Sequence, residues 1–147
     1  PQPAPPPRVI APAPAPIAQG PIAGSIEDFA FQTGGEPRVY FGYDQHTLTP
    51  EARQTLRQQA EWLKAYPNYS AVVEGHADER GTRQYNIALG ARRANSVKSF
   101  LVSQGVGPER LTTVSYGKER PIDPRSNDEG WARNRNGHTN LRPLGSS

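Results

Sequence analysis

Hydrophobic residues recur at strand spacing and helical spacing in alternation along most of the chain. Residues 38–43 (RVYFGY) are rich in β-branched and aromatic side chains and predict a strand. A helix is predicted to begin at Pro50, because Thr49 is a suitable cap and apolar residues then recur at helical spacing until Pro67. Residues 71–73 (AVV) predict a second, short strand.

The second half of the chain continues this alternation. Thr82 is a suitable cap for another helix, which Gly105 is expected to end as a left-handed terminator. Residues 111–116 (LTTVSY) predict a third strand, residues 128–135 a short helix, and residues 139–142 a last, mostly polar strand. The order β-α-β-α-β-(α)-β predicts an α+β fold, a two-layer sandwich whose helices pack on one small mixed sheet.

The amino-terminal segment has a different composition. Residues 1–25 are rich in proline and alanine, and they hold too few large apolar side chains to offset the entropy of ordering. We interpret them as a flexible linker, either a semi-rigid polyproline spacer or a disordered tail. A single domain is expected over residues 26–142, opened by a short apolar patch at residues 26–31, with residues 143–147 as a tail.

Composition and charge exclude several classes of function. The absence of cysteine excludes disulfides, thiolate zinc sites and cysteine nucleophiles. The net charge is +3, but basic and acidic residues are interleaved, so no Lys/Arg block typical of nucleic-acid binding appears and no nucleic-acid partner is expected. No apolar run approaches the roughly eighteen residues that would span a bilayer, and no signal-peptide pattern is present.

The densest group of charges lies in residues 75–81 (GHADERG), between a predicted strand and a predicted helix. Each helical residue advances by about 100°. On that basis the helix has an apolar face formed by Ile87, Ala91, Ala94, Val97, Lys98 and Leu101, with Lys98 at its edge. Asn86 and Arg93 fall on one rim of this face, where a side chain can present its polar head to a ligand. Arg92 faces elsewhere.

Asp78 and Arg93 are the candidates for binding a ligand that carries both signs of charge. The planar guanidinium of Arg93 suits a carboxylate, and Asp78 lies in a glycine-bounded loop with exposed backbone N–H groups. The structural alternatives are a solvated Arg93, a salt bridge from Arg93 to Asp78 or Glu79, and a turn or capping role for Asp78. The residues alone leave these alternatives open.

His76 and the acids beside it resemble fragments of metal or catalytic sites. A zinc site needs three or four well-placed ligands, and His46 and His138 do not supply the usual spacing. No serine has a nucleophile-elbow context, and the adjacent side chains of Asp78 and Glu79 diverge. We therefore expect no metal, no cofactor and no catalytic residue, and we expect His76 to shape the loop through hydrogen bonds.

The sequence GHADERGTRQYNIALGARRANSVKSFL resembles the signature of the OmpA C-terminal-like peptidoglycan-binding domain family, in particular its peptidoglycan-associated lipoprotein (Pal) branch. The similarity covers residues 36–142, through VYFGYDQHTLTPEA, VVEGHADERGT, VSYGKERP and WARNR in the family's order. The resemblance implies a non-catalytic module that binds the diaminopimelate of the peptidoglycan stem peptide noncovalently. A cell-wall-lytic or metal-dependent hydrolase is the alternative.

The resemblance also implies roles for individual residues. Arg93 matches the family's ligand-binding arginine, which takes the diaminopimelate carboxylate, and Asp78 matches the aspartate that binds the ammonium or amide end. Tyr43 and Asp44 match a second cluster of the same pocket, although from the residues alone Tyr43 could be a core aromatic and Asp44 a turn acid. The expected ligand-binding residues are Asp78, Arg93, Asn86, Leu89, Tyr43 and Asp44. Possible supporting residues are Glu74, His76 and Arg80, of which Glu74 and Arg80 would orient Asp78 or Arg93.

At the level of the cell, the resemblance implies a periplasmic protein attached to the outer membrane through an upstream lipidated cysteine. It further implies TolB as a partner, with TolA as a further candidate, in a Tol-Pal-type system that supports envelope integrity and cell division. One departure concerns the family's Asn-Arg-Arg motif, which here reads Asn134-Arg135-Asn136 and precedes an unusually polar strand. This departure leaves open the edge of the sheet and any ligand role of Arg135.

Overall fold

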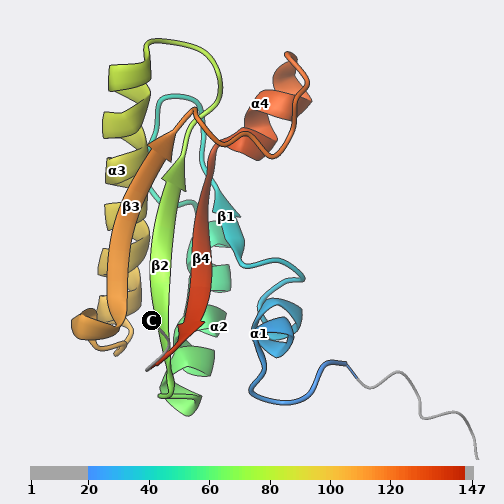
Figure 1. Cartoon of the computed structure of the whole chain (residues 1–147), viewed down its shortest axis with the longest axis vertical. Helices are drawn as coiled ribbons and strands as arrows, with labels where there is room; N and C mark the ends of the chain where they lie inside the picture. The colour runs from blue at the N-terminus through green and yellow to red at the C-terminus, as the bar shows by residue number, and fades with distance from the viewer. Residues whose placement is uncertain (1–19, 145–147) are drawn as a thin grey trace, which may run out of the picture.

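The computed structural model describes residues 20–144 (Figure 1). Residues 1–19 of the predicted linker and residues 145–147 of the predicted tail lie outside the described residues. The elements are α1 (Ile26–Gln32), β1 (Arg38–Tyr40), α2 (Pro50–Ala65), β2 (Tyr69–His76), α3 (Arg83–Ser103), the 3-10 turn η1 (Pro108–Arg110), β3 (Leu111–Gly117), α4 (Asp128–Asn134) and β4 (Asn136–Pro143). The predicted order of strands and helices is confirmed, and the apolar patch at residues 26–31 forms the additional helix α1.

The strands form one mixed sheet in the order β1-β4-β2-β3. β2 and β3 are parallel, whereas β4 is antiparallel to both β1 and β2. Helices α2 and α3 lie behind the sheet in Figure 1, which confirms the two-layer α+β prediction. The polar strand β4 lies inside the sheet and not at its edge. Within residues 20–144, no helix is both long and apolar enough to cross a membrane.

The helix ends follow the sequence signals closely. Thr49 caps α2 by accepting a hydrogen bond of 3.0 Å from the backbone N–H of Ala52, and Thr82 caps α3 in the same way at 3.1 Å. Gly105 ends α3 with a φ of 102°, after which the N–H of Val106 bonds back to the carbonyl of Leu101. These local predictions are confirmed.

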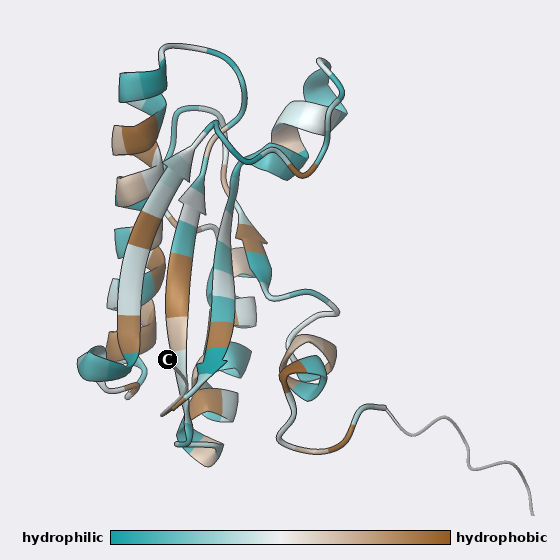
Figure 2. Cartoon of the chain, viewed as in Figure 1, coloured by the Kyte–Doolittle hydropathy of each residue, from teal (hydrophilic) through white to brown (hydrophobic). Residues whose placement is uncertain are grey.

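The core lies between the sheet and the two long helices. Its most buried apolar side chains include Leu56, Leu63, Val73, Val97 and Leu101. Figure 2 shows hydrophobic positions along β2 and β3, while the start of α3 and the loop before it are largely hydrophilic. The packed core therefore ends near the start of α3, where polar side chains begin to predominate.

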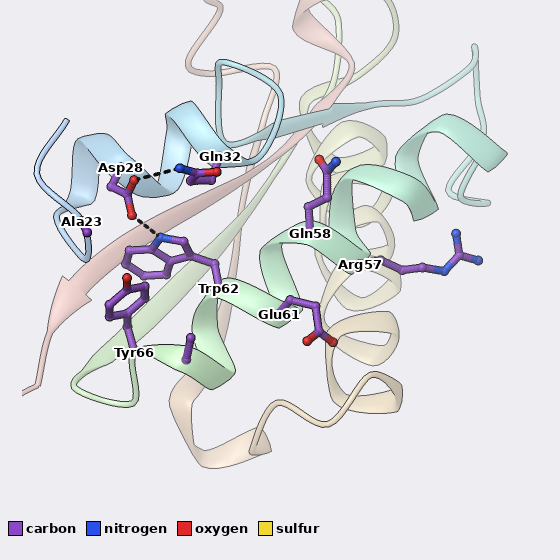
Figure 3. Close-up of a pocket in the computed structure, with 9 residues that line it drawn as sticks. Ala23, Asp28, Gln32, Arg57, Gln58, Glu61, Trp62 and Tyr66 are labelled. Carbon is purple, nitrogen blue, oxygen red and sulfur yellow. Dashed lines mark hydrogen bonds between the residues drawn. The ribbon is translucent and has the colours of Figure 1, made fainter. Parts of the chain in front are cut away.

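Helix α1 packs against α2 through aromatic and polar contacts. The ring of Phe29 meets the ring of Trp62 at a centroid distance of 5.0 Å. The indole N–H of Trp62 donates to Asp28 at 2.8 Å, and Tyr66 lies beside it in an open groove between the two helices (Figure 3). These contacts fix α1 on the domain, far in sequence from residues 75–81.

The predicted buried face of α3 is correct for Ala94, Val97 and Leu101 and wrong for Ile87, Ala91 and Lys98. The buried residues of α3 are Asn86, Leu89, Gly90, Arg93, Ala94, Val97 and Leu101. Ala91 is exposed, while Ile87 and Lys98 are only partly buried. The true face is rotated by about 60° from the predicted one at about 100° per residue. Asn86 and Arg93 consequently lie within the buried face and not on its rim, whereas Arg92 is exposed as expected.

Two glycines explain how a polar helix face comes so close to the sheet. A Cβ atom on Gly75 of β2 would lie 1.6 Å from the carbonyl oxygen of Gly90 on α3. A Cβ atom on Gly90 would lie 2.3 Å from the hydroxyl of Ser115. Because neither side chain exists, α3 approaches β2 closely enough for Arg93 to reach the carbonyl of His76.

The ends of several elements meet at one end of the sheet. β1, β2 and β3 end there and β4 begins there, because β4 is antiparallel to its two neighbours. Helix α4 extends beyond this end instead of covering a face of the sheet (Figure 1). The strand predicted for residues 38–43 ends at Tyr40, so Tyr43 and Asp44 lie in a turn, in which Asp44 has a φ of 55°.

Candidate functional site

A pocket of about 140 Å³ opens at this end of the sheet. It is lined by Tyr43, Asp44, Asp78, Arg80, Gly81, Tyr85, Asn86, Leu89 and Arg93. The structure thus brings together all the residues that the sequence analysis named as ligand-binding. Gly81 and Tyr85 also line the pocket and were not predicted. Both lie in the segment that carries the family resemblance, which is the signal that could have identified them.

Arg93 is completely buried, with 0% of its surface exposed. Its Nε donates to the carbonyl of Gln45 at 2.8 Å. Its Nη1 donates to the carbonyl of His76 at 2.8 Å, and its Nη2 to that of Gly42 at 3.1 Å. These bonds tie the loop after β1 to the end of β2. They use three of the five guanidinium N–H groups, and Arg93 also lines the pocket.

The structural alternatives for Arg93 are wrong, since it is neither solvated nor paired directly with Asp78 or Glu79. Burial lowers the pKa of Arg93 to about 10, and the nearby positive charge of Arg135 acts in the same direction. The guanidinium therefore stays charged at neutral pH. A buried cation held by backbone carbonyls is a fixed positive pole on one wall of the pocket.

Asp78 is the negative pole, and it is 4% exposed. Its Oδ1 accepts from the backbone N–H of Arg80 at 3.0 Å and from Arg80 Nε at 3.1 Å. Its Oδ2 accepts from Arg80 Nη2 at 2.8 Å and from Arg135 Nη1 at 3.4 Å. Burial alone would raise the pKa of Asp78, but the hydrogen bonds from Arg80 and Arg135 outweigh it and lower that pKa. The carboxylate is therefore ionised, and it closes a turn while lining the pocket.

Arg80 lies between two aromatic rings. Its guanidinium carbon is 4.4 Å from the ring centroid of Tyr43 and 4.1 Å from that of Trp131. Tyr43 is 65% exposed, so the alternative of a core aromatic is wrong. The indole N–H of Trp131 donates to Glu79 at 2.9 Å, which links α4 to the charged loop. The sequence analysis missed Trp131, although the WARNR motif contains it.

Asn86, Leu89 and Arg135 support the pocket in different ways. Asn86 Nδ2 donates to the carbonyl of Arg80 at 2.8 Å and to that of Thr82 at 3.0 Å, so it fixes the loop on the start of α3. Leu89 is buried and supplies an apolar wall. Arg135 donates from Nε to the carbonyl of Phe41 at 2.9 Å, in addition to its bond with Asp78. Arg135 therefore helps to hold the site despite the altered motif around it.

Glu74 and His76 do not line the pocket. Glu74 follows the core residue Val73, so it points to the opposite face of the sheet. Its Oε1 accepts from His76 Nε2 at 3.1 Å and from His138 Nδ1 at 3.2 Å, while Asn140 bonds Oε2 at 3.1 Å. The predictions that Glu74 orients Asp78 or Arg93, and that the His76 side chain bonds within the loop, are wrong. His76 acts on the loop through its backbone carbonyl.

The charge state of Glu74 follows from these contacts. Burial alone would raise the pKa of Glu74, but the hydrogen bonds from His138, His76 and Asn140 outweigh it and hold that pKa below its ordinary value.

Within residues 20–144, no group of three or more His, Cys, Asp or Glu side chains is arranged to hold a metal ion. The charged side chains that line the pocket are Asp44, Asp78, Arg80 and Arg93, a set that suits a small ligand with both signs of charge.

Fold and site together define a class of protein. Residues 40–135 match the OmpA family, and the chain belongs to that family. It is 50% identical to the peptidoglycan-associated lipoprotein of Agrobacterium fabrum over 118 residues, which is 80% of this chain and 66% of that protein. It is also 50% identical over 123 residues to the peptidoglycan-associated lipoprotein of Mesorhizobium japonicum, covering 84% of this chain and 72% of that protein.

The solved structures agree with the sequence relatives. The crystal structure of the peptidoglycan-associated lipoprotein from Burkholderia pseudomallei superimposes with a TM-score of 0.71 at 36% identity, covering 73% of this chain and 91% of that chain. The family prediction and the predicted OmpA-like fold are confirmed. The chain spans about two thirds of the length of the Agrobacterium relative.

Proposed function

We propose that the pocket binds the diaminopimelate of a peptidoglycan stem peptide noncovalently. The observation that carries this proposal is the presence of a buried carboxylate and a buried guanidinium, Asp78 and Arg93, in one pocket of about 140 Å³. The free end of diaminopimelate carries an ammonium and a carboxylate on the same carbon atom. Such an end group requires an acceptor and a planar donor that face one small volume. The names of the relatives, peptidoglycan-associated lipoproteins, support the proposal.

We further propose a role for each part of the pocket. Asp78 accepts from the ligand's ammonium, and Arg93 donates to the carboxylate with the N–H groups that do not bond to backbone carbonyls. Asp44 adds negative charge on the ammonium side. Leu89 and the ring of Tyr43 pack on the aliphatic stem. In this proposal Arg93 is both part of the scaffold and a ligand contact.

The same proposal extends to the cell envelope. Residues 26–142 form the binding domain, and residues 1–25 link it to a lipidated cysteine upstream that attaches the protein to the outer membrane. The protein then lies in the periplasm and anchors the outer membrane to the cell wall. We include TolB, and with it TolA, as partners in a Tol-Pal-type system that supports envelope integrity and cell division. The family membership supports this extension.

Cosedimentation with purified cell wall tests the proposal. The protein is expected to pellet with diaminopimelate-type peptidoglycan and not with lysine-type peptidoglycan, because lysine lacks the second carboxylate. Equal pelleting with both types would contradict recognition of the zwitterionic end. The supernatant is expected to contain no released wall fragments, and measurable release would favour the alternative of a wall-lytic hydrolase.

A further inference from the structure

We propose that Arg80 is an internal counter-ion that occupies the place of the ligand's ammonium on Asp78 in the free protein. Binding then requires an exchange in which the ligand's ammonium displaces the Arg80 guanidinium. Arg80 would thereby limit the affinity of the site and restrict it to ligands with a cation able to replace the guanidinium. The inference rests on the proposed function and concerns how the same pocket is regulated.

The hydrogen bonds of Asp78 show why an exchange is needed. A carboxylate offers about four lone-pair sites to donors. Asp78 already accepts four bonds, three of them from Arg80 and one from Arg135. An incoming ammonium therefore has no vacant position on this carboxylate. It must replace a donor that is already bound.

Among these donors, the Arg80 guanidinium is the one placed to leave. The backbone N–H of Arg80 is fixed by the turn, and Arg135 is held from its other side by the carbonyl of Phe41. The Arg80 side chain is 35% exposed, whereas that of Asp78 is 5% exposed. The guanidinium is otherwise held by the rings of Tyr43 and Trp131, which favour a cation without forming directional bonds.

The chain contains a second copy of the same local geometry. Arg125 donates to Asp123 from its backbone N–H at 3.0 Å, from Nε at 3.0 Å and from Nη2 at 2.7 Å. Neither Asp123 nor Arg125 lines the pocket. An Asp-x-Arg turn of this kind therefore also forms away from the pocket. Arg80 differs from Arg125 in lining the pocket, where its guanidinium can compete with a ligand's ammonium for the carboxylate. Arg125 therefore provides a matched control.

Isothermal titration of the full chain with a muropeptide that carries uncrosslinked meso-diaminopimelate tests the inference. Arg80→Gln is expected to bind about three- to tenfold more tightly than the wild type, because the exchange no longer has to break an ion pair. Arg125→Gln removes the same charge elsewhere and is expected to bind like the wild type. Equal or weaker binding by Arg80→Gln, with Arg125→Gln unchanged, would overturn the inference and make Arg80 a ligand contact or a scaffold residue.

A second measurement follows the guanidinium itself. In the free protein the Nε–H of Arg80 is bonded and flanked by two rings, so its NMR signal is expected to be shifted and protected from solvent exchange. Saturation with the muropeptide should abolish this protection while Arg93 stays protected. An Arg80 signal that remains protected in the complex would overturn the exchange. Failure of the proposed function is distinct, because the wild type and Arg125→Gln would then show no binding at all.

Discussion

Replacement of Arg93 by alanine is expected to destabilise the domain strongly, before any effect on ligand is considered. The variant removes three hydrogen bonds from a charged group to the carbonyls of Gln45, His76 and Gly42. Each hydrogen bond to a charged group contributes about 1.5–3 kcal/mol, and such values are not additive. A loss of roughly 3–5 kcal/mol in the free energy of unfolding is therefore expected.

Urea denaturation followed by far-UV circular dichroism measures this loss. Arg92→Ala is the matched control, because Arg92 is the neighbouring arginine on the same helix and is exposed. Its unfolding free energy is expected to stay within about 0.5 kcal/mol of the wild type. Arg93→Lys retains the charge but loses the planar fork, so it is expected to fall between the two. A difference of less than about 1 kcal/mol between Arg93→Ala and Arg92→Ala would refute the scaffold role.

This prediction changes how binding experiments are interpreted. If Arg93→Ala fails to pellet with peptidoglycan, the loss reports partial unfolding as readily as a missing ligand contact. Asp78 is a better residue to vary, because three of its four hydrogen bonds come from Arg80, two residues away, and only one comes from a distant residue, Arg135. Binding should therefore be tested at Asp78, with stability measured on the same samples.

Three further predictions concern stability. Gly90→Ala is expected to lower the free energy of unfolding by about 1–3 kcal/mol despite the better helix propensity of alanine, because the new Cβ would lie 2.3 Å from the Ser115 hydroxyl. Thermal unfolding measures this loss, and an unchanged melting temperature would contradict it. The folded-state pKa of Glu74 is lowered from 4.5, so the Glu74 carboxylate stabilises the fold above pH 4.5 and loses this contribution as the pH falls further. Glu74→Gln should therefore make the free energy of unfolding fall less steeply on acidification, and an unchanged slope would argue against this linkage. Trp62→Phe leaves Asp28 without its indole donor and should cost about 1–2 kcal/mol in urea denaturation, whereas no cost would mean that water replaces the indole.

The parts of the fold that local chemistry decides could be predicted from the sequence. Thr49 and Thr82 are caps whose side chains act within their own helix turn, and Gly105 is a terminator for the same local reason. The sheet order could not be obtained in this way. The polar strand β4 lies inside the sheet. Its His138 and Asn140 bond Glu74 on the uncovered face, whereas its Thr139 bonds Gln59 of the covering helix α2, so pairing with distant strands and not polarity decides its place.

The site shows the same division between local and distant causes. Hydrophobicity alone placed Arg93 on the rim of α3, because the carbonyls that satisfy it belong to loops up to 51 residues away in sequence. Glu79 accepts a hydrogen bond from Trp131, and Asp78 accepts one from Arg135, each more than 50 residues away in sequence. A local sequence pattern cannot predict such contacts. The six residues that the family resemblance implied as ligand-binding line one pocket together with Arg80, Gly81 and Tyr85, and their role in binding stays a prediction.

The central claim is that the Asp78 carboxylate receives the cationic end of diaminopimelate. Titration of Asp78→Asn and Asp123→Asn with the uncrosslinked muropeptide tests it most directly, because both variants remove a carboxylate from the same kind of Asp-x-Arg turn and only Asp78 lines the pocket. Asp78→Asn is expected to bind at least about tenfold more weakly, as loss of a charge-assisted bond requires, while Asp123→Asn binds like the wild type. Wild-type affinity in a folded Asp78→Asn variant would contradict the account.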